Sequence, residues 1–208
     1  MLAYKAAGLK VICYFSAGSY EDWRDDKTAF PKSYILEPLD GWQGENWLKL
    51  TGFEPGHITS PLAPIMTARM KMAKSKGCDA VDPDNMDGYN HSKSITEQDQ
   101  IKYNSWIAKE AHDIGISVGL KNAAELAPIL APLFDFSVVE QCNQYNECGS
   151  YGVFPTISKP IFAIEYNSNT AKTCTALNKF KPGLNGLVKK MELDAWAFDC
   201  ITNTQLAN

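Results

Sequence analysis

The chain has 208 residues, of which 45% are hydrophobic and 21% are charged, and its formal net charge is −4. This composition fits one soluble globular domain and excludes a disordered chain. Acidic and basic residues are interspersed, which excludes a basic stripe for nucleic acid and a polybasic segment for an anionic membrane. No apolar run reaches the roughly 18 residues of a membrane-spanning helix, and residues 1–10 lack the layout of a signal peptide. We therefore expect neither nucleic-acid nor membrane partners.

Short β-branched or aromatic runs alternate with longer stretches of helical character along the whole chain. Such alternation is typical of parallel strands joined by crossover helices. Several runs are continuously apolar, as expected of strands that are buried on both faces. The sequence therefore predicts seven parallel strands, at residues 11–15, 47–50, 79–82, 117–120, 136–140, 161–165 and 184–188.

Two helices between these strands have recognisable ends. Ser60 followed by Pro61 is typical of an N-cap and a first-turn proline, and Gly77 stands where a left-handed C-cap belongs. Thr96 begins a capping-box variant, and Gly115 follows the apolar face of that second helix. We expect both helices to belong to the scaffold.

Two architectures produce this alternation: an open doubly wound sheet and a closed (β/α)8 barrel. No GxGxxG or P-loop follows any predicted strand, so the nucleotide-binding signature of the open form is missing. In a barrel the active site lies at the C-terminal ends of the strands, and polar residues gather there. They are Ser16, Asp82, Asp84, Lys121, Asn122, Glu140, Gln141 and Glu165. The sequence therefore predicts a TIM-type barrel that forms a single domain over residues 1–208.

The six cysteines include no CxxC pair, which argues against a zinc ribbon or a redox motif. Two pairs have spacings compatible with loop-closing disulfides in an oxidising compartment. These pairs are Cys142 with Cys148 and Cys174 with Cys200. We expect Cys13 and Cys78 to be buried free thiols, because each lies beside a β-branched apolar run and unpaired cysteine is among the most buried residue types.

Other catalytic signatures are missing from the sequence. His57, His91 and His112 stand singly, without HxxxH or His-Cys spacing, so no metal site is predicted. No GxSxG elbow accompanies any serine, which argues against a serine hydrolase. We expect an enzyme that needs no cofactor.

Five separated segments stand at predicted strand ends. They are VICYFSAGSYEDWR (11–24), GCDAVDPDNMDGY (77–89), GLKN (119–122), EQCNQYNEC (140–148) and IEY (164–166). In this order they resemble glycoside hydrolase family 114 over nearly the whole chain. The resemblance implies a secreted, extracellular enzyme with a TIM-type barrel. It also implies endo-acting hydrolysis of α-1,4-linked galactosamine polymers. We expect the protein to be a monomer.

The resemblance further implies catalysis by an aspartate and a glutamate. In glycoside hydrolysis one carboxyl protonates the leaving oxygen while the other attacks the sugar or activates water. The aspartate of the family's Pro-Asp-Asn segment falls on Asp84, and the glutamate of its Glu-Gln-Cys segment falls on Glu140. Asp82 is the rival for the first role. Retention or inversion of the sugar configuration stays open.

Further side chains near the strand ends are candidates for substrate contacts. We expect most of them to hydrogen-bond sugar hydroxyls or the substrate amine, and Trp23 to stack on a sugar ring. A cationic galactosamine polymer suits an acidic groove. The candidate substrate-binding residues are Tyr14, Ser16, Trp23, Asp82, Lys121, Asn122, Gln141, Tyr145 and Glu165.

The sequence departs from the family at its N-terminus. The resemblance implies a further strand before residues 7–12, whereas this chain begins within the expected first helix. We therefore expect an N-terminally incomplete barrel with two unpaired strand edges. Two alternatives stay open: a catalytically inactive barrel that binds carbohydrate, and a glycosidase for a different exopolysaccharide.

Overall fold

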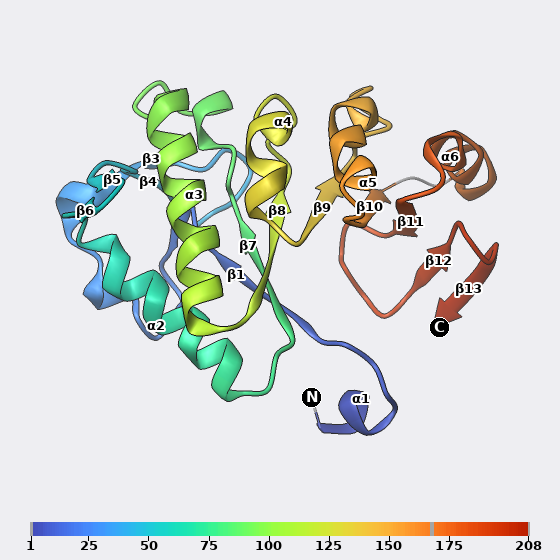
Figure 1. Ribbon diagram of the computed structural model, residues 1–208, viewed down its shortest axis with the longest axis horizontal. Coiled ribbons are helices and arrows are strands. Elements are labelled where there is room, and N and C mark those ends of the chain that lie inside the picture. Colours follow the sequence, from blue (N-terminus) through green and yellow to red (C-terminus); the bar gives the residue numbers. More distant parts are fainter. Residues whose placement is uncertain (1, 167–168, 208) are drawn as a thin grey trace. The chain divides into compact units, whose positions relative to one another are not determined.

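The structure, a computed structural model, describes residues 2–166 and 169–207. It divides into two units: the first unit is Met1–Lys121 and the second unit is Asn122–Asn208. Strands alternate with helical segments in both units (Figure 1). This pattern confirms the alternation that the sequence predicts.

The first unit is organised around three parallel strands in the order β1–β7–β8 (Figure 1). They are β1 (Ile12–Ser16), β7 (Ala80–Asp84) and β8 (Ser117–Lys121). The register pairs Ser16 with Asp84 at the ends of β1 and β7. Because the strands run in one direction, their polar C-terminal residues meet at the same edge.

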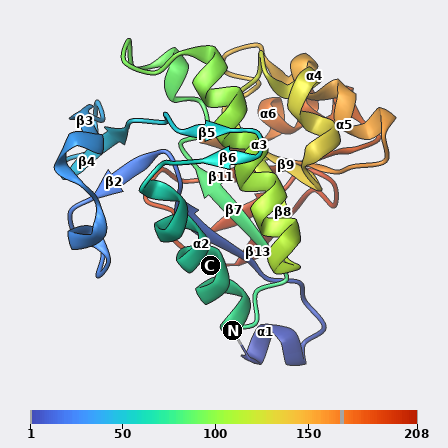
Figure 2. The same cartoon turned by 60° about the vertical axis from the view of Figure 1, so that its left-hand side comes forward.

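Helices α2 (Leu62–Ser75) and α3 (Glu97–Ile114) lie side by side in the first unit (Figures 1 and 2). The predicted ends of α3 are confirmed, because the Thr96 side chain accepts from Asp99 N–H and Gly115 has a φ of 79°. Helix α2 begins at Leu62, with Pro61 as its N-cap residue. The remaining helical segments of this unit are α1 (Leu2–Ala6), η1 (Lys27–Ala29), η2 (Lys32–Tyr34) and η3 (Gly88–Asn90).

An antiparallel insertion separates β1 from α2. Its strands are β2 (Ser19–Glu21), β3 (Ile35–Pro38) and β4 (Glu45–Leu48), with β4 in the middle. The prediction of a parallel strand at residues 47–50 is therefore wrong. Parallel neighbours need a long crossover, usually a helix, whereas the residues between β1 and β4 form only short strands and single 3-10 turns.

A short hairpin completes the insertion (Figure 2). It consists of β5 (Phe53–Glu54) and β6 (His57–Ile58). The Phe53 ring lies 4.8 Å from the ring centroids of both Tyr103 and Trp106 of α3. Aromatic contacts of this kind hold the hairpin on the helix.

The second unit is organised around the parallel strands β9 (Phe136–Glu140), β10 (Ile161–Tyr166) and β11 (Leu184–Lys189). The sequence predicts these strands within one residue at each end. It does not predict the antiparallel pair that follows, β12 (Ala197–Asp199) and β13 (Thr204–Ala207).

Short helical segments precede and connect these strands. They are α4 (Ala127–Leu130), η4 (Ala131–Leu133), η5 (Cys148–Gly152), α5 (Val153–Thr156), α6 (Thr170–Leu177) and η6 (Asn178–Phe180). Helix α6 packs closely on β11, because a Cβ at Gly186 would lie 2.7 Å from Leu177 Cδ1. The missing side chain at Gly186 leaves room for Leu177 against β11.

All six cysteines are paired. The bridges that the sequence allows, Cys142–Cys148 and Cys174–Cys200, are both present. The prediction of free thiols at Cys13 and Cys78 is wrong, because these two residues form the third bridge. Cys78 precedes β7, and the parallel pairing of β7 with β1 brings the two Cα atoms to 5.9 Å, within the range of a disulfide.

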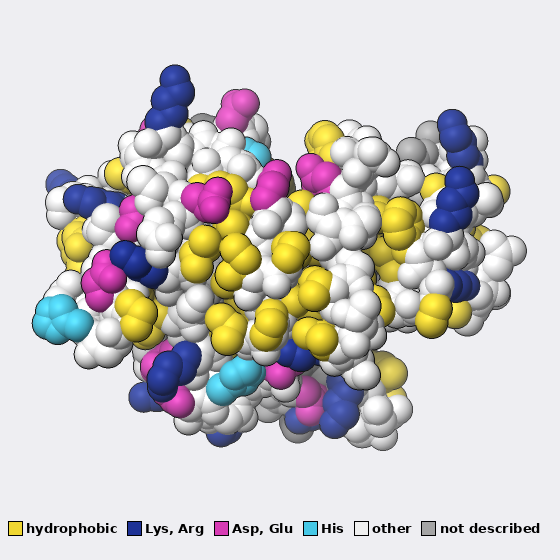
Figure 3. Space-filling model, turned by 45° about the horizontal axis from the view of Figure 1, so that its top comes forward, with side chains coloured by type: hydrophobic (Ala, Val, Ile, Leu, Met, Phe, Trp, Pro, Cys, Tyr) yellow, Lys and Arg dark blue, Asp and Glu magenta, His cyan; other side chains and the backbone are white. Residues whose placement is uncertain are grey.

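Charged side chains are distributed over the surface. On the face drawn in Figure 3, Lys and Arg side chains form several separate groups, and Asp and Glu side chains lie between some of them. Among the residues that the structure describes, no helix has the length and apolar character needed to cross a bilayer.

Candidate active site

The Asp84 cluster lies in the first unit and consists of Tyr14, Asp82, Asp84 and Lys121. Lys121 ends β8 and is only 4% exposed. Its Nζ lies 3.3 Å from Asp82 Oδ2 and 3.4 Å from Asp84 Oδ1. A buried ammonium is costly unless carboxylates pair with it. Lys121 therefore holds the two candidate carboxylates together, and little of its side chain faces solvent.

Tyr14 supplies a second donor to Asp84. Its Oη donates to Asp84 Oδ2 at 2.9 Å. The partial burial of the hydroxyl and the neighbouring Asp84 carboxylate raise the pKa of Tyr14. Tyr14 therefore remains a hydroxyl donor at any ordinary pH, while about half of its side chain stays exposed.

A chain of polar side chains begins at the half-buried Asn85, directly after Asp84, and continues into the interior. Asn85 Nδ2 donates to Ser16 Oγ at 3.0 Å and to Ser19 Oγ at 3.2 Å. The two serine Oγ atoms lie 2.6 Å apart, and Ser19 Oγ donates to Glu45 Oε2 at 2.7 Å. Burial raises the pKa of Glu45. Ser16, a predicted substrate contact, is fully buried and supports the turn after Asp84.

The backbone after β1 passes very close to the end of β7. The N–H groups of Ala17 and Gly18 donate to Asp84 O at 3.0 and 3.1 Å. A Cβ at Gly18 would lie 1.8 Å from Asn85 O. Because only glycine fits this approach, Gly18 fixes the backbone position of Asp84.

Trp23 stands on the loop after β2 and is 50% exposed. Two bidentate pairs fix this loop. Arg24 donates Nε and Nη2 to the two oxygens of Glu21, each at 2.7 Å. Arg69 donates in the same way to Asp26, at 2.7 and 2.8 Å. Paired parallel hydrogen bonds restrict orientation, so Trp23 presents its ring from an ordered loop.

The Glu140 cluster lies in the second unit and consists of Asn122, Glu140 and Tyr166. Tyr166 Oη donates to Glu140 Oε1 at 2.5 Å. Asn122 Oδ1 accepts from the backbone N–H of Glu140 at 2.9 Å. The φ of Asn122 is 50°, a left-handed value that asparagine tolerates better than most residues. These contacts fix both the backbone and the carboxyl of Glu140 at the end of β9.

Residues 141–148 form the loop that follows Glu140. Gln141 N–H donates to Ile164 O at 2.8 Å, and Gln141 Nε2 donates to Gln144 Oε1 at 3.1 Å. Tyr145 is 59% exposed. The loop therefore presents two of the predicted substrate contacts, Gln141 and Tyr145, immediately after Glu140 in the chain.

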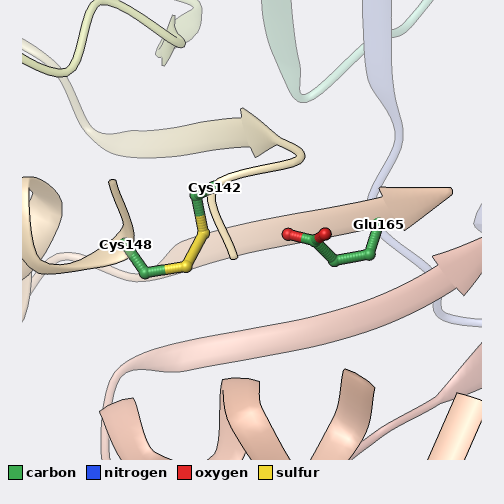
Figure 4. Close-up of side chains that lie close together, drawn as sticks. All are labelled: Cys142, Cys148 and Glu165. Atoms are coloured by element: carbon green, nitrogen blue, oxygen red, sulfur yellow. A yellow bond between two sulfur atoms is a disulfide. The ribbon is translucent and has the colours of Figure 1, made fainter. Parts of the chain in front are cut away.

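Glu165, also a predicted substrate contact, is only 1% exposed. Its Oε1 accepts from Asn143 N–H at 2.8 Å. Figure 4 shows its carboxylate beside the disulfide between Cys142 and Cys148. Burial raises the pKa of Glu165. The carboxylate thus binds the loop backbone instead of facing solvent.

Cys142, Cys148 and Glu165 also form one compact group of potential metal ligands among the described residues, with ligand atoms within 4.8 Å of one another. The two sulfur atoms are joined to each other. Thiolates are the form of cysteine that binds metals, so the bridged pair offers no sulfur ligand.

Sequence reasoning missed Tyr166, Asn85 and Glu45. Tyr166 and Asn85 directly follow predicted site residues at strand ends, and that position was an available signal. Nothing in the sequence pointed to Glu45. Its partner Ser19 lies 26 residues earlier, and the two meet only because β2 pairs with β4.

Known proteins share this fold. The profile of the glycoside-hydrolase family GH114 matches residues 1–205. The crystal structure of Aspergillus fumigatus Ega3 in complex with galactosamine is 41% identical, with a TM-score of 0.86 over 96% of this chain and 82% of that chain. The glycoside hydrolase domain of PelA from Pseudomonas aeruginosa is 15% identical, with a TM-score of 0.67 over 94% and 83%, and supports the fold alone. No curated protein sequence matched the chain.

Proposed function

Since the chain belongs to glycoside hydrolase family GH114, we propose that it cleaves α-1,4-linked galactosamine polymers by endo attack. Family membership makes it an O-glycosyl hydrolase with a TIM-type (β/α)8 barrel, as the sequence predicts. The choice of sugar rests on one observation: the structure of the 41% identical Ega3 contains galactosamine.

Asp84 and Glu140 are the proposed catalytic pair. Each ends a parallel strand, which is where (β/α)8 barrels place catalytic groups. Each also accepts a hydrogen bond from a tyrosine hydroxyl: Asp84 from Tyr14, and Glu140 from Tyr166. Carboxyls that are oriented in this way suit proton transfer and attack on a sugar, because both steps demand fixed geometry.

The two carboxyls are proposed to have different roles. The Lys121 ammonium, 3.4 Å from Asp84 Oδ1, stabilises negative charge on Asp84. Asp84 therefore suits the carboxylate that attacks the sugar or activates water, and Glu140 then protonates the leaving oxygen. Asp82 shares the same ammonium and is proposed to position Lys121.

The exposed aromatic side chains are proposed to bind the polymer. Trp23 and Tyr145 offer rings for stacking on sugar faces and for contact with protonated amines. Asn122 and Gln141 offer amide groups for sugar hydroxyls. The net charge of −4 favours approach of a cationic polymer.

The disulfides support a proposed extracellular location. All six cysteines are paired, and such bridges form and persist in oxidising compartments. We propose that the enzyme acts as a monomer, because one chain supplies both proposed catalytic groups.

A reducing-end assay on partially deacetylated galactosamine polymer tests the proposal. Asp84→Asn and Glu140→Gln preserve side-chain shape but remove ionisation, so each is expected to lower kcat by about 10³-fold. Glu192→Gln is the matched control, because Glu192 is an exposed carboxylate of the second unit. It is expected to keep wild-type activity.

Other outcomes of this assay point to other functions. If Asp82→Asn lost as much activity as Asp84→Asn with Lys121 still in place, the catalytic role would pass to Asp82. If the wild-type protein retained the polymer on a column without releasing reducing ends, a carbohydrate-binding barrel would replace the enzyme.

A further inference from the structure

The carboxylate of Glu165 is the anchor of a neighbouring loop. Glu165 lies near the end of β10, and its side chain is almost completely buried. Its Oε1 accepts from Asn143 N–H at 2.8 Å, and Gln144 N–H also donates to the carboxylate. Two consecutive backbone donors therefore converge on one buried side chain.

The same loop is closed by a disulfide. Cys142 and Cys148 lie 6 residues apart, and Glu147 N–H donates to Cys142 O at 2.7 Å within the closed segment. Figure 4 shows that the disulfide and the Glu165 carboxylate lie close together at the start of the loop. The loop of residues 141–148 is thus tied to β10 by the carboxylate and closed on itself by the bridge.

The outer side of this loop carries proposed substrate contacts. Tyr145 is exposed, and its N–H donates to Gln141 O at 3.0 Å. Gln141 directly follows Glu140, so a displacement of the loop moves these contacts relative to the catalytic carboxyl that precedes them.

We infer that Glu165 is a positioning residue that, together with the Cys142–Cys148 bridge, sets the substrate-binding conformation of residues 141–148. This inference rests on the proposed function and assigns Glu165 a different task from direct sugar contact. Burial raises the pKa of Glu165, and the N–H groups of Asn143 and Gln144 oppose that rise. The carboxylate and the loop backbone therefore stabilise each other.

Hydrogen–deuterium exchange of the Asn143 and Gln144 amides tests the anchor without any substrate. Glu165→Ala removes both acceptor oxygens and is expected to accelerate exchange of these amides by about tenfold or more. Glu165→Gln keeps one acceptor oxygen and is expected to give an intermediate rate. Serine at both Cys142 and Cys148 is expected to accelerate the same amides.

The matched controls are variants of the second unit, which also contains Glu165. Glu192→Gln changes an exposed carboxylate, and serine at both Cys174 and Cys200 removes the other disulfide. Both are expected to leave the two amides at wild-type rates. Wild-type exchange of these amides in Glu165→Ala would overturn the inference. If that variant does not fold, wild-type exchange in Glu165→Gln would overturn it equally.

Steady-state kinetics then separates positioning from catalysis. Glu165→Ala, or Glu165→Gln in its place, is expected to raise KM for the polymer by about tenfold while kcat changes by less than about threefold. A fall in kcat as deep as that of Glu140→Gln would overturn the positioning role. If the wild-type protein released no reducing ends, the proposed function would fail, and the exchange rates would still decide whether Glu165 anchors the loop.

Discussion

In the first unit a buried ammonium and a hydroxyl hold the proposed catalytic carboxylate Asp84, whereas in the second unit a hydroxyl and a backbone contact hold Glu140. The Lys121 ammonium lies 3.4 Å from Asp84, and the Tyr166 hydroxyl lies 2.5 Å from Glu140. A buried ion pair loses most of its value when one partner is removed. A loop tied by several hydrogen bonds and a disulfide loosens in steps. We therefore expect the loss of Lys121 to destabilise the Asp84 cluster in one step, whereas single changes in the loop of residues 141–148, which follows Glu140, have smaller effects.

Lys121→Met removes the cation of the Asp84 cluster and has the largest expected effect on stability. Methionine has a similar length but no charge, so Asp82 and Asp84 lose their shared cation. Removal of one partner from a buried ion pair costs about 3–5 kcal/mol, and urea unfolding is expected to show a loss in this range. The reducing-end assay is expected to show about 10²-fold lower kcat, because the charge on Asp84 is no longer stabilised.

Lys102→Met is the matched control for this change. Lys102 pairs with the exposed Glu54 at 2.7 Å in the same unit, and exposed pairs contribute about 0–1 kcal/mol. In the second unit, Tyr166→Phe removes the hydroxyl from Glu140 and is expected to cost less than Lys121→Met. Equal stability losses in Lys121→Met and Lys102→Met would contradict the account of the first cluster.

The disulfides of the two units are expected to contribute differently to the free energy of unfolding. The first unit is bridged across 65 residues, by Cys13–Cys78, and the loop of the second unit is bridged across 6. If each bridge acts by restricting the unfolded chain, the long one contributes about 4 kcal/mol and the short one about 2 kcal/mol. Urea unfolding of the two double serine variants is expected to follow this order. The reverse order would mean that folded-state contacts of the short bridge outweigh chain entropy.

The smallest expected effect is a pH dependence of stability in the first unit. Burial raises the pKa of Glu45 above its ordinary value of 4.5. Below pH 4.5 this carboxyl is protonated in the folded and the unfolded chain. As the pH rises the unfolded chain ionises first, so the stability contributed by Glu45 is lost until the pH passes the folded-state pKa. Above pH 4.5, the urea midpoint of the wild type is therefore expected to fall relative to that of Glu45→Gln.

Glu37 provides a control of opposite sign in the same insertion. The Ser92 hydroxyl donates to Glu37 and lowers its pKa, so this contribution is present above pH 4.5 and is lost as the pH falls. The effect is expected to be small because Glu37 is exposed. If Glu45→Gln and Glu37→Gln changed the pH dependence of the urea midpoint in the same direction, burial would not explain the effect of Glu45 on stability.

Much of the fold was predictable because its signals are local. The cap at Thr96 and the left-handed Gly115 are read from a few neighbouring residues, and the structure confirms both. The apolar runs at residues 136–140 and 161–165 also became strands. The run at residues 47–50 led to the wrong prediction of a parallel strand, because buried side chains occur in antiparallel strands as well as in parallel ones.

The candidate site was predictable in position but not in exposure. Asp84 and Glu140 stand at strand ends, as expected. Ser16, Lys121 and Glu165 stand there too, yet each is buried and bound to other protein groups. Which side of a strand end faces solvent depends on the loops that cover it, and short sequence motifs carry no such information.

The sequence by itself determined the alternation of elements, the polar strand ends and the family, because periodicity, capping and motif order are properties of short segments. Only the tertiary structure decided that Lys121 joins two aspartates 39 and 37 residues earlier, that Cys13 meets Cys78, and that Glu165 anchors a loop 22 residues earlier. These contacts join residues that are distant in the chain, so they depend on how strands pair and in which register.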